Sequence, residues 1–203
     1  DIFSIDRIAK SGLSIVIPFP DHRIDKKSMI REAVTNYFYP IISEKLKIKF
    51  DDQEIHSKNL REMAAKYATT TLGEPDQQNL LFDFIEDICT AEKSSLIKLE
   101  DSWIEDKKLD ECDFQPEDLI KIREKYASGK LVGVELPIVI KKKDGKEKQS
   151  KFSCYIQKPA GLKKSYDMFV RRGLTLPEET TMSKSRLALG AMIAEDEYIC
   201  EFL

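Results

Sequence analysis

The sequence is poor in the residues on which common catalytic and cofactor sites depend. Its 8 glycines are never two residues apart, so the chain has no G-x-G step, no Walker phosphate loop and no dinucleotide fingerprint. Only His22 and His56 are present, and the 4 cysteines are scattered without a C-x-x-C pair. This scarcity excludes the usual zinc sites and most nucleophile–base pairings, so we expect no metal site in the chain.

Long apolar runs are also missing. No stretch reaches the roughly 18 residues that a membrane helix needs, and no signal-peptide pattern opens the sequence. With 41% hydrophobic and 34% charged residues, the 203-residue chain is typical of a soluble, cytoplasmic globular protein. It begins at Asp1 without methionine and ends in the amphipathic stretch AEDEYICEFL. We therefore expect a fragment of a longer protein that has no membrane contact.

Charge is spread unevenly along the chain. The net charge is −10 over residues 51–128 and +8 over residues 129–190, against −3 for the whole sequence. This pattern indicates a strand–helix–strand start at 1–51, an acidic helical insert at 52–129 and basic strands with a terminal helix at 130–203. The first and third parts are expected to form one domain.

Hydrophobic periodicity predicts the individual elements. β-Branched residues and period-two alternation predict strands at 12–20, 45–50, 130–143, 150–159, 166–176 and 185–196. Apolar residues three or four positions apart predict helices at 26–42, 57–69, 76–89, 91–105 and 116–127. Asp25 can cap the first helix, and Asp144-Gly145 predicts a hairpin turn. The expected class is α+β, with a mostly antiparallel sheet and packed helices.

Glu32 and Asn36 stand four residues apart in the predicted 26–42 helix, so their side chains share one face. An E-x-x-x-N pair of this kind places a carboxylate and an amide beside the nucleotide in the GHKL ATPases. Such a site also needs glycine-rich loops that let the backbone approach the nucleotide, and this chain lacks them. We interpret the pair as the polar face of an ordinary helix.

A nuclease site can be assembled from Asp76 and the E-x-K of Glu105 and Lys107. An E-x-K pair holds a metal and a lysine together when it lies on a central strand. Here it lies in the acidic helical region, so we do not expect nuclease activity.

The lysine-rich run 141–151 surrounds the predicted hairpin tip. Its candidates for nucleic-acid contact are Lys141, Lys142, Lys143 and Lys146. The same lysines also suit a hairpin tip that is charged for solubility and edge protection. No aromatic residue is interleaved with them, so sequence-specific reading is not indicated.

Basic residues also flank the polar loop between the last two predicted strands. They are Arg171, Arg172, Lys184 and Arg186. The loop has no glycine or proline between Glu178 and Gly190, and hydroxyl side chains surround its lysine. A cation on such a loop can reach an anion held by a neighbouring domain, and a merely solvated basic loop is the alternative.

Two stretches carry a resemblance to a known family. They are SGLSIVIPFP followed by REAVTNYFYPIISEKLKIKF, and MFVRRGLTLP followed by ALGAMIAEDEYICEFL. Both resemble the segment after the ATPase domain in prokaryotic GHKL (Hsp90-type) ATPases related to the MORC proteins. The resemblance covers both ends of the chain but not its helical middle.

The resemblance implies a fold similar to the transducer domain of gyrase B and MutL, with a left-handed βαβ unit. It implies that ATP and Mg²⁺ bind in an ATPase domain that precedes this chain in the parent protein. The fragment itself is then expected to hold no cofactor and to have no catalytic activity. By the same resemblance Lys184 contacts the γ-phosphate, with Arg172 and Arg186 as substitutes. A homodimer and a DNA-associated defence role stay open, and a nucleic-acid-binding or protein-interaction module is the alternative function.

Overall fold

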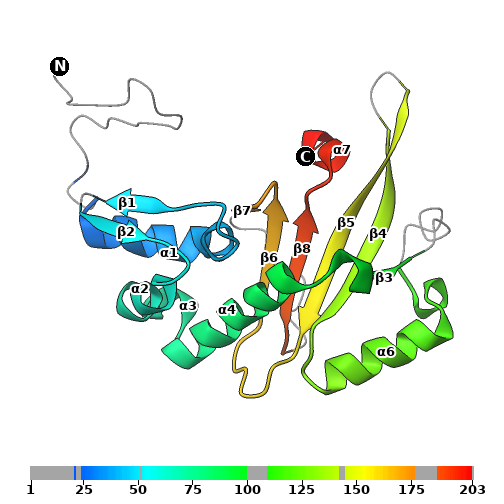
Figure 1. Ribbon diagram of the computed structural model, residues 1–203, viewed down its shortest axis with the longest axis horizontal. Helices are drawn as coiled ribbons and strands as arrows, with labels where there is room; N and C mark the ends of the chain where they lie inside the picture. Colours follow the sequence, from blue (N-terminus) through cyan, green and yellow to red (C-terminus); the bar gives the residue numbers. More distant parts are fainter. Residues whose placement is uncertain are drawn as a thin grey trace.

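The computed structural model describes residue 21 and residues 24–50, 52–99, 109–141, 145–176 and 187–202. Across these ranges the chain combines a six-stranded mixed sheet, a two-stranded antiparallel ribbon and packed helices (Figure 1). The expected α+β class is therefore confirmed. The predicted strand at 12–20 lies outside the described residues.

The large sheet has the strand order β3–β4–β5–β8–β6–β7. Its members are β3 (Ile97–Lys98), β4 (Val132–Lys141), β5 (Glu147–Gln157), β6 (Tyr166–Arg171), β7 (Leu174–Leu176) and β8 (Leu189–Ala194). The pairs β4–β5, β5–β8 and β6–β7 are antiparallel, whereas β3–β4 and β6–β8 are parallel. Antiparallel pairs are thus in the majority, as the alternating sequence patterns predict.

Most of the described helices precede β4 in the sequence. The helices are α1 (Lys26–Ile42), α2 (Leu60–Tyr67), α3 (Thr69–Leu72), α4 (Pro75–Thr90), α6 (Pro116–Ala127) and α7 (Glu197–Phe202). The ribbon consists of β1 (Ile48–Phe50) and β2 (Gln53–Ile55). In sequence, α6 lies between the parallel strands β3 and β4, which makes a β–α–β crossover. The left-handed βαβ unit that the resemblance implies stays a prediction. No described helix combines the length and apolar character needed to cross a membrane.

Local signals set the helix ends. The Asp25 carboxylate accepts a hydrogen bond from the Ser28 amide at 2.7 Å, and the Asp25 amide donates to the Ser28 hydroxyl at 3.1 Å. This reciprocal cap starts α1 where the sequence predicts it. Pro75 and Pro116 occupy the first turns of α4 and α6, where an amide donor is not needed. Gly129 follows α6 with a φ of 71°, a conformation that glycine adopts without strain.

The predicted helix at 91–105 is wrong where the structure describes it. Lys93–Ser95 form a single 3-10 turn, and Ile97–Lys98 form the strand β3. The Leu99 amide donates to the Glu135 carbonyl at 3.2 Å, which extends the pairing with β4. Backbone pairing with an existing strand therefore outweighs the helical spacing of the apolar residues.

The predicted single strand at 166–176 is also wrong, because it folds back on itself as the β6–β7 hairpin. Arg172 and Gly173 have φ angles of 50° and 80°, the left-handed conformation that a two-residue hairpin turn requires. The predicted strand at 45–50 is shorter than expected and begins only at Ile48.

The main core lies between the helices and one face of the sheet (Figure 1). Phe38 of α1 contacts Phe82 of α4 with ring centroids 6.0 Å apart and Tyr166 of β6 with centroids 5.9 Å apart. Met168 and Ala191 lie in the same buried cluster. The core thus joins all three parts that charge patterning separates, and their boundaries as domains stay a prediction.

A smaller buried cluster fixes α7 to the long hairpin. Its members are Ile140, Ala194, Ile199 and Cys200. The α7 segment therefore packs on the β4–β5 hairpin and the end of β8, in a cluster separate from the main core.

Candidate functional site

The Glu32 and Asn36 side chains meet on the exposed face of α1, as the sequence predicts. The Asn36 amide donates to the Glu32 carboxylate at 3.1 Å and to the Glu32 carbonyl at 3.1 Å. Each polar group thus finds a partner on its own helix, as expected for the polar face of an ordinary helix.

Arg172 lies on the turn between β6 and β7, and the turn is held from two sides. The Arg172 amide donates to the Ala194 carbonyl at the end of β8, at 3.0 Å. A Cβ atom placed on Gly173 would come within 3.0 Å of the Lys45 side chain, so the turn lies directly against a residue three positions beyond the end of α1. The Lys45 ammonium in turn binds the Glu195 carboxylate at 2.8 Å. The turn, the end of α1 and the end of β8 therefore meet at one point.

The side chain of Arg172 is exposed and carries no ion pair within the described ranges. The same is true of the half-buried Arg171. Three other arginines in these ranges each bind a carboxylate, namely Arg31, Arg61 and Arg123. The hairpin turn thus presents a guanidinium that is free to bind an anion from another molecule or domain.

The structure separates Arg172 from the loop to which the sequence assigns it. Leu189 pairs with Tyr166 at the start of β6, whereas Arg172 follows the end of that strand. The described beginning of β8 is therefore one strand length away from the arginine turn. Lys184 and Arg186 lie outside the described residues.

Some lysines of the β4–β5 hairpin already interact with neighbouring side chains. The Lys141 ammonium binds the Glu147 carboxylate at 2.9 Å, and the Lys148 ammonium lies 5.0 Å from the centroid of the Tyr198 ring. Lys146 is exposed near the tip, and Lys142 and Lys143 lie outside the described residues. Part of the positive charge that the sequence indicates is thus already neutralised by neighbouring side chains.

Asp76 lies exposed in the first turn of α4, and the Glu105 and Lys107 of the nuclease reading lie outside the described ranges. Among the residues that the structure does describe, no group of three or more His, Cys, Asp or Glu side chains could hold a metal ion.

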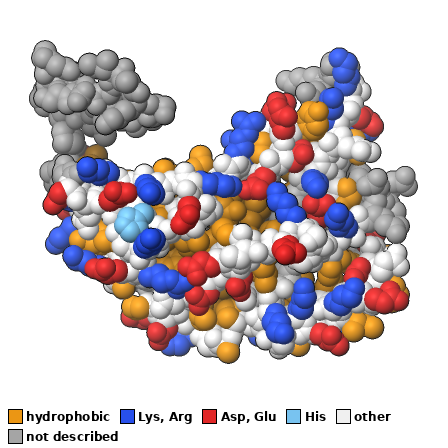
Figure 2. Space-filling model, in the orientation of Figure 1, with side chains coloured by type: hydrophobic (Ala, Val, Ile, Leu, Met, Phe, Trp, Pro, Cys, Tyr) orange, Lys and Arg blue, Asp and Glu red, His pale blue; other side chains and the backbone are white. Residues whose placement is uncertain are grey.

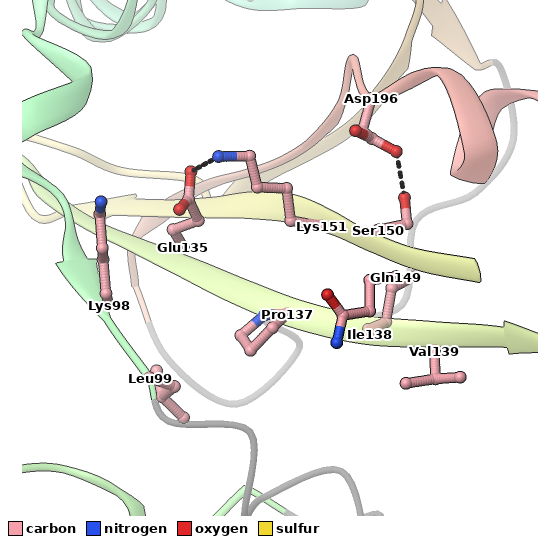
Figure 3. A pocket seen from close by; sticks show the side chains of 10 residues that line it. All are labelled: Lys98, Leu99, Glu135, Pro137, Ile138, Val139, Gln149, Ser150, Lys151 and Asp196. Atoms are coloured by element: carbon pink, nitrogen blue, oxygen red, sulfur yellow. Dashed lines mark hydrogen bonds and ion pairs between the residues drawn. The ribbon is translucent and has the colours of Figure 1, made fainter. Parts of the chain in front are cut away.

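A first hollow of about 470 Å³, which we call the strand pocket, lies beside β4 and β5 (Figure 3). Its charged side chains include Lys98 and the pair Glu135 and Lys151, whose carboxylate and ammonium groups are 2.9 Å apart. Leu99, Pro137 and Val139 supply apolar wall.

Two further polar groups of the strand pocket, Ser150 and Asp196, hold α7 in place. The Ser150 hydroxyl hydrogen-bonds to the Asp196 carboxylate (Figure 3). It also accepts a hydrogen bond from the Ile199 amide at 3.1 Å. The Asp196 carboxylate also accepts from the Tyr198 amide at 3.1 Å. Because Ser150 and Asp196 are already hydrogen-bonded, this end of the pocket serves the attachment of α7.

A second hollow of about 420 Å³, which we call the seam pocket, lies between the ends of α1 and α4 and the sheet. Its mouth carries Lys45, Lys93 and Glu195, and its walls include the hydroxyl or thiol groups of Tyr39, Cys89 and Tyr155. Figure 2 shows hydrophobic side chains in the hollow middle of the visible face, with basic and acidic side chains around them. The seam pocket shares Glu135, Lys151 and Asp196 with the strand pocket.

Burial shifts the titration of the groups in the seam pocket. Burial, together with the nearby Cys89, Glu195 and Tyr155, raises the pKa of Tyr39, and partial burial also raises the pKa values of Cys89 and Tyr155. At neutral pH all three groups therefore keep their protons and can act as hydrogen-bond donors. Sequence reasoning missed this pocket because its walls come from segments far apart in the chain.

Comparison of the chain with models of known protein families, with curated proteins and with solved structures finds no match. The family resemblance of the sequence therefore stays a prediction, and the geometry of the described residues carries the functional reasoning.

Proposed function

We propose that this chain is a transducer-like coupling module of a larger GHKL-type ATPase. In this role it converts ATP binding in a preceding domain of the same protein into movement of the domains. The supporting observation is Arg172, an exposed guanidinium without an ion pair in the described ranges, on a turn that two other segments hold in place. A coupling module needs such a cation to meet the phosphate held by its neighbour.

The attachments of the turn explain how a contact at the guanidinium could be transmitted. The Arg172 amide is bonded to the end of β8, and Gly173 lies against Lys45 at the end of α1. Both β8 and α1 contribute to the main core. A pull on the turn is thus passed to the layer that carries the helices, because packed cores shift as units and deform little.

The test uses the full-length gene product that contains this chain. A charge-assisted contact to phosphate contributes about 1.5–3 kcal/mol, so Arg172→Ala should lower ATP turnover roughly ten- to a hundredfold. Lys163→Ala removes the same charge from an exposed position on another segment and should have little effect. Thermal unfolding of both variants should match the wild type, because neither side chain is buried.

Lys184→Ala and Arg186→Ala are to be measured in the same assay, since either can supply the cation instead. Wild-type turnover in all three variants would remove the phosphate contact from the mechanism. Tight ATP binding by the 203-residue chain alone would contradict the coupling role, since that role assigns the nucleotide to another domain.

Nucleic-acid binding at the β4–β5 hairpin is a second candidate function, favoured by the way the hairpin extends beyond the rest of the sheet (Figure 1). It predicts weak, sequence-independent binding that falls steeply with salt. Joint replacement of Lys141, Lys142, Lys143 and Lys146 by alanine should then weaken binding to all DNA sequences about equally. Unchanged retention on DNA would identify the hairpin tip as a solubility feature only.

A further inference from the structure

We infer that the seam pocket binds a small organic anion, with an apolar body inside the pocket and a carboxylate at its mouth. Binding there is independent of the coupling role proposed above. Three features carry the inference: a tyrosine hydroxyl that faces the pocket, a carboxylate already held at the mouth, and an apolar interior of suitable size.

The hydroxyl belongs to Tyr39, which lines the pocket and is only 4% exposed. It forms no hydrogen bond with any other residue that the structure describes. Its oxygen is not among the fully buried atoms that lack a hydrogen-bond partner, so it is open to the pocket and can donate to a group that enters there. Because the phenol keeps its proton, it suits an acceptor oxygen on a ligand.

The mouth of the pocket shows which kind of acceptor it holds. The Glu195 carboxylate lies between two ammonium groups, 2.8 Å from that of Lys45 and 3.9 Å from that of Lys93. The Lys93 side chain is 86% exposed, so its ammonium can turn toward an incoming group. A ligand carboxylate that takes the place of the Glu195 side chain would find two cations and the Tyr39 donor together.

The remaining acidic groups of the pocket do not compete for these cations. Glu135 is bound by Lys151 at 2.9 Å, and Asp196 is hydrogen-bonded to Ser150. Lys45 and Lys93 are therefore the cations that become available when Glu195 moves aside.

Apolar side chains form the interior, namely Ile88, Leu96, Phe152 and Ile193. A volume of about 420 Å³ lies within the roughly 300–1,000 Å³ of typical small-molecule sites. The pocket thus suits a compact aryl or branched alkyl group that carries one carboxylate.

Calorimetric titration with 4-phenylbutyrate and with its uncharged analogue 4-phenylbutanamide tests the inference. The acid should bind about tenfold more tightly than the amide, because only the acid makes charge-assisted hydrogen bonds. Tyr39→Phe removes one donor to the ligand carboxylate and should weaken binding of the acid about tenfold or more, the size of one hydrogen bond to a charged acceptor.

Glu195→Gln should have the opposite effect and tighten binding of the acid severalfold, because it removes the carboxylate that competes for Lys45 and Lys93. A purely structural role of Glu195 would give weaker or unchanged binding. Lys163→Gln, on a segment away from the pocket lining, is the matched control and should leave the affinity unchanged.

Two exposed cysteines provide a second readout that needs no variant. Cys89 lines the pocket and Cys112 does not. Bound 4-phenylbutyrate should slow alkylation of Cys89 by iodoacetamide severalfold and leave Cys112 unchanged, as followed by mass spectrometry of the two peptides. No binding of the acid up to about 10 mM, equal affinity for acid and amide, or equal alkylation of Cys89 with and without the acid would each overturn the inference.

Discussion

The helices α4 and α6 begin alike and end in different environments. Both start with a proline in the first turn, lack a side-chain cap and repeat apolar residues three or four positions apart. In α4 these residues are buried, and Phe82, Phe84 and Ile85 are fully inaccessible. In α6 no residue is buried, and Ile120 is 56% exposed. The spacing of apolar residues thus determines where a helix forms. How much of the helix is buried depends on the strands and helices that pack against it.

The two helices have different neighbours. The helix α4 crosses in front of β6, β8 and β5 and packs with α1 and α2 over the main core (Figure 1). The helix α6 lies beside β4 near the other edge of the sheet. Of these two helices, only α4 is enclosed from several sides.

The largest effect is expected from the matched pair Phe82→Ala and Ile120→Ala. The Phe82 ring is inaccessible, packs against Phe38 and lies 5.7 Å from the Arg61 guanidinium. Removing it should lower the free energy of unfolding by about 3–5 kcal/mol, measured by urea denaturation. Ile120→Ala should cost less than about 1 kcal/mol, because most of its side chain stays in water when the chain folds. Equal losses at the two sites would erase the contrast between the helices.

A smaller effect is expected at Gln78, the buried polar residue of α4. Its side-chain amide is 1% exposed and donates to the Gly73 carbonyl at 2.7 Å and the Ala64 carbonyl at 3.3 Å. Gln78→Leu keeps the approximate size but leaves both carbonyls without this donor, so the free energy of unfolding should fall by about 1–3 kcal/mol. Unchanged stability would mean that water takes over these bonds and that the buried character of α4 is weaker than the structure indicates.

The smallest effect is expected from a pair of arginines. Arg61 binds Asp83 and Glu86 of α4 at 2.7 and 2.8 Å, whereas Arg123 of α6 binds Glu111 at 2.9 Å with both side chains mostly exposed. Arg61→Met should lower the free energy of unfolding by about 1 kcal/mol, and Arg123→Met by about 0–0.5 kcal/mol. Raising the salt concentration should shrink both losses, because exposed ion pairs are screened. A larger loss of unfolding free energy for Arg123→Met than for Arg61→Met would contradict the expected difference between α6 and α4.

The sequence predicts those elements whose signals are local. Capping by Asp25, the first-turn prolines and Gly129 place α1, α4 and α6 at or near the expected residues. The errors fall where a partner far along the chain decides the outcome. Segment 91–99 yields a short strand because β4 offers a free edge, which no local pattern reveals.

Local sequence patterns predict less of the candidate site than of the helices. Arg172 was singled out by its charge, but its turn could have been found from Arg172-Gly173 itself, since a glycine between two apolar runs is a hairpin signal. The seam pocket had no such signal. Tyr39, Cys89 and Lys45 look like ordinary core and surface residues until the sheet brings Glu195 beside them.

Hydrogen–deuterium exchange of the full-length protein, with and without a non-hydrolysable ATP analogue, tests the coupling role most directly. We predict that the peptide spanning the β6–β7 turn exchanges more slowly when the analogue is bound, because Arg172 then contacts the nucleotide-binding neighbour. The peptide spanning α6 should exchange equally in both states, since α6 lies near the edge of the sheet that is opposite the β6–β7 hairpin (Figure 1). Unchanged exchange of the turn at a saturating concentration of the analogue would contradict the role of this chain as a transducer.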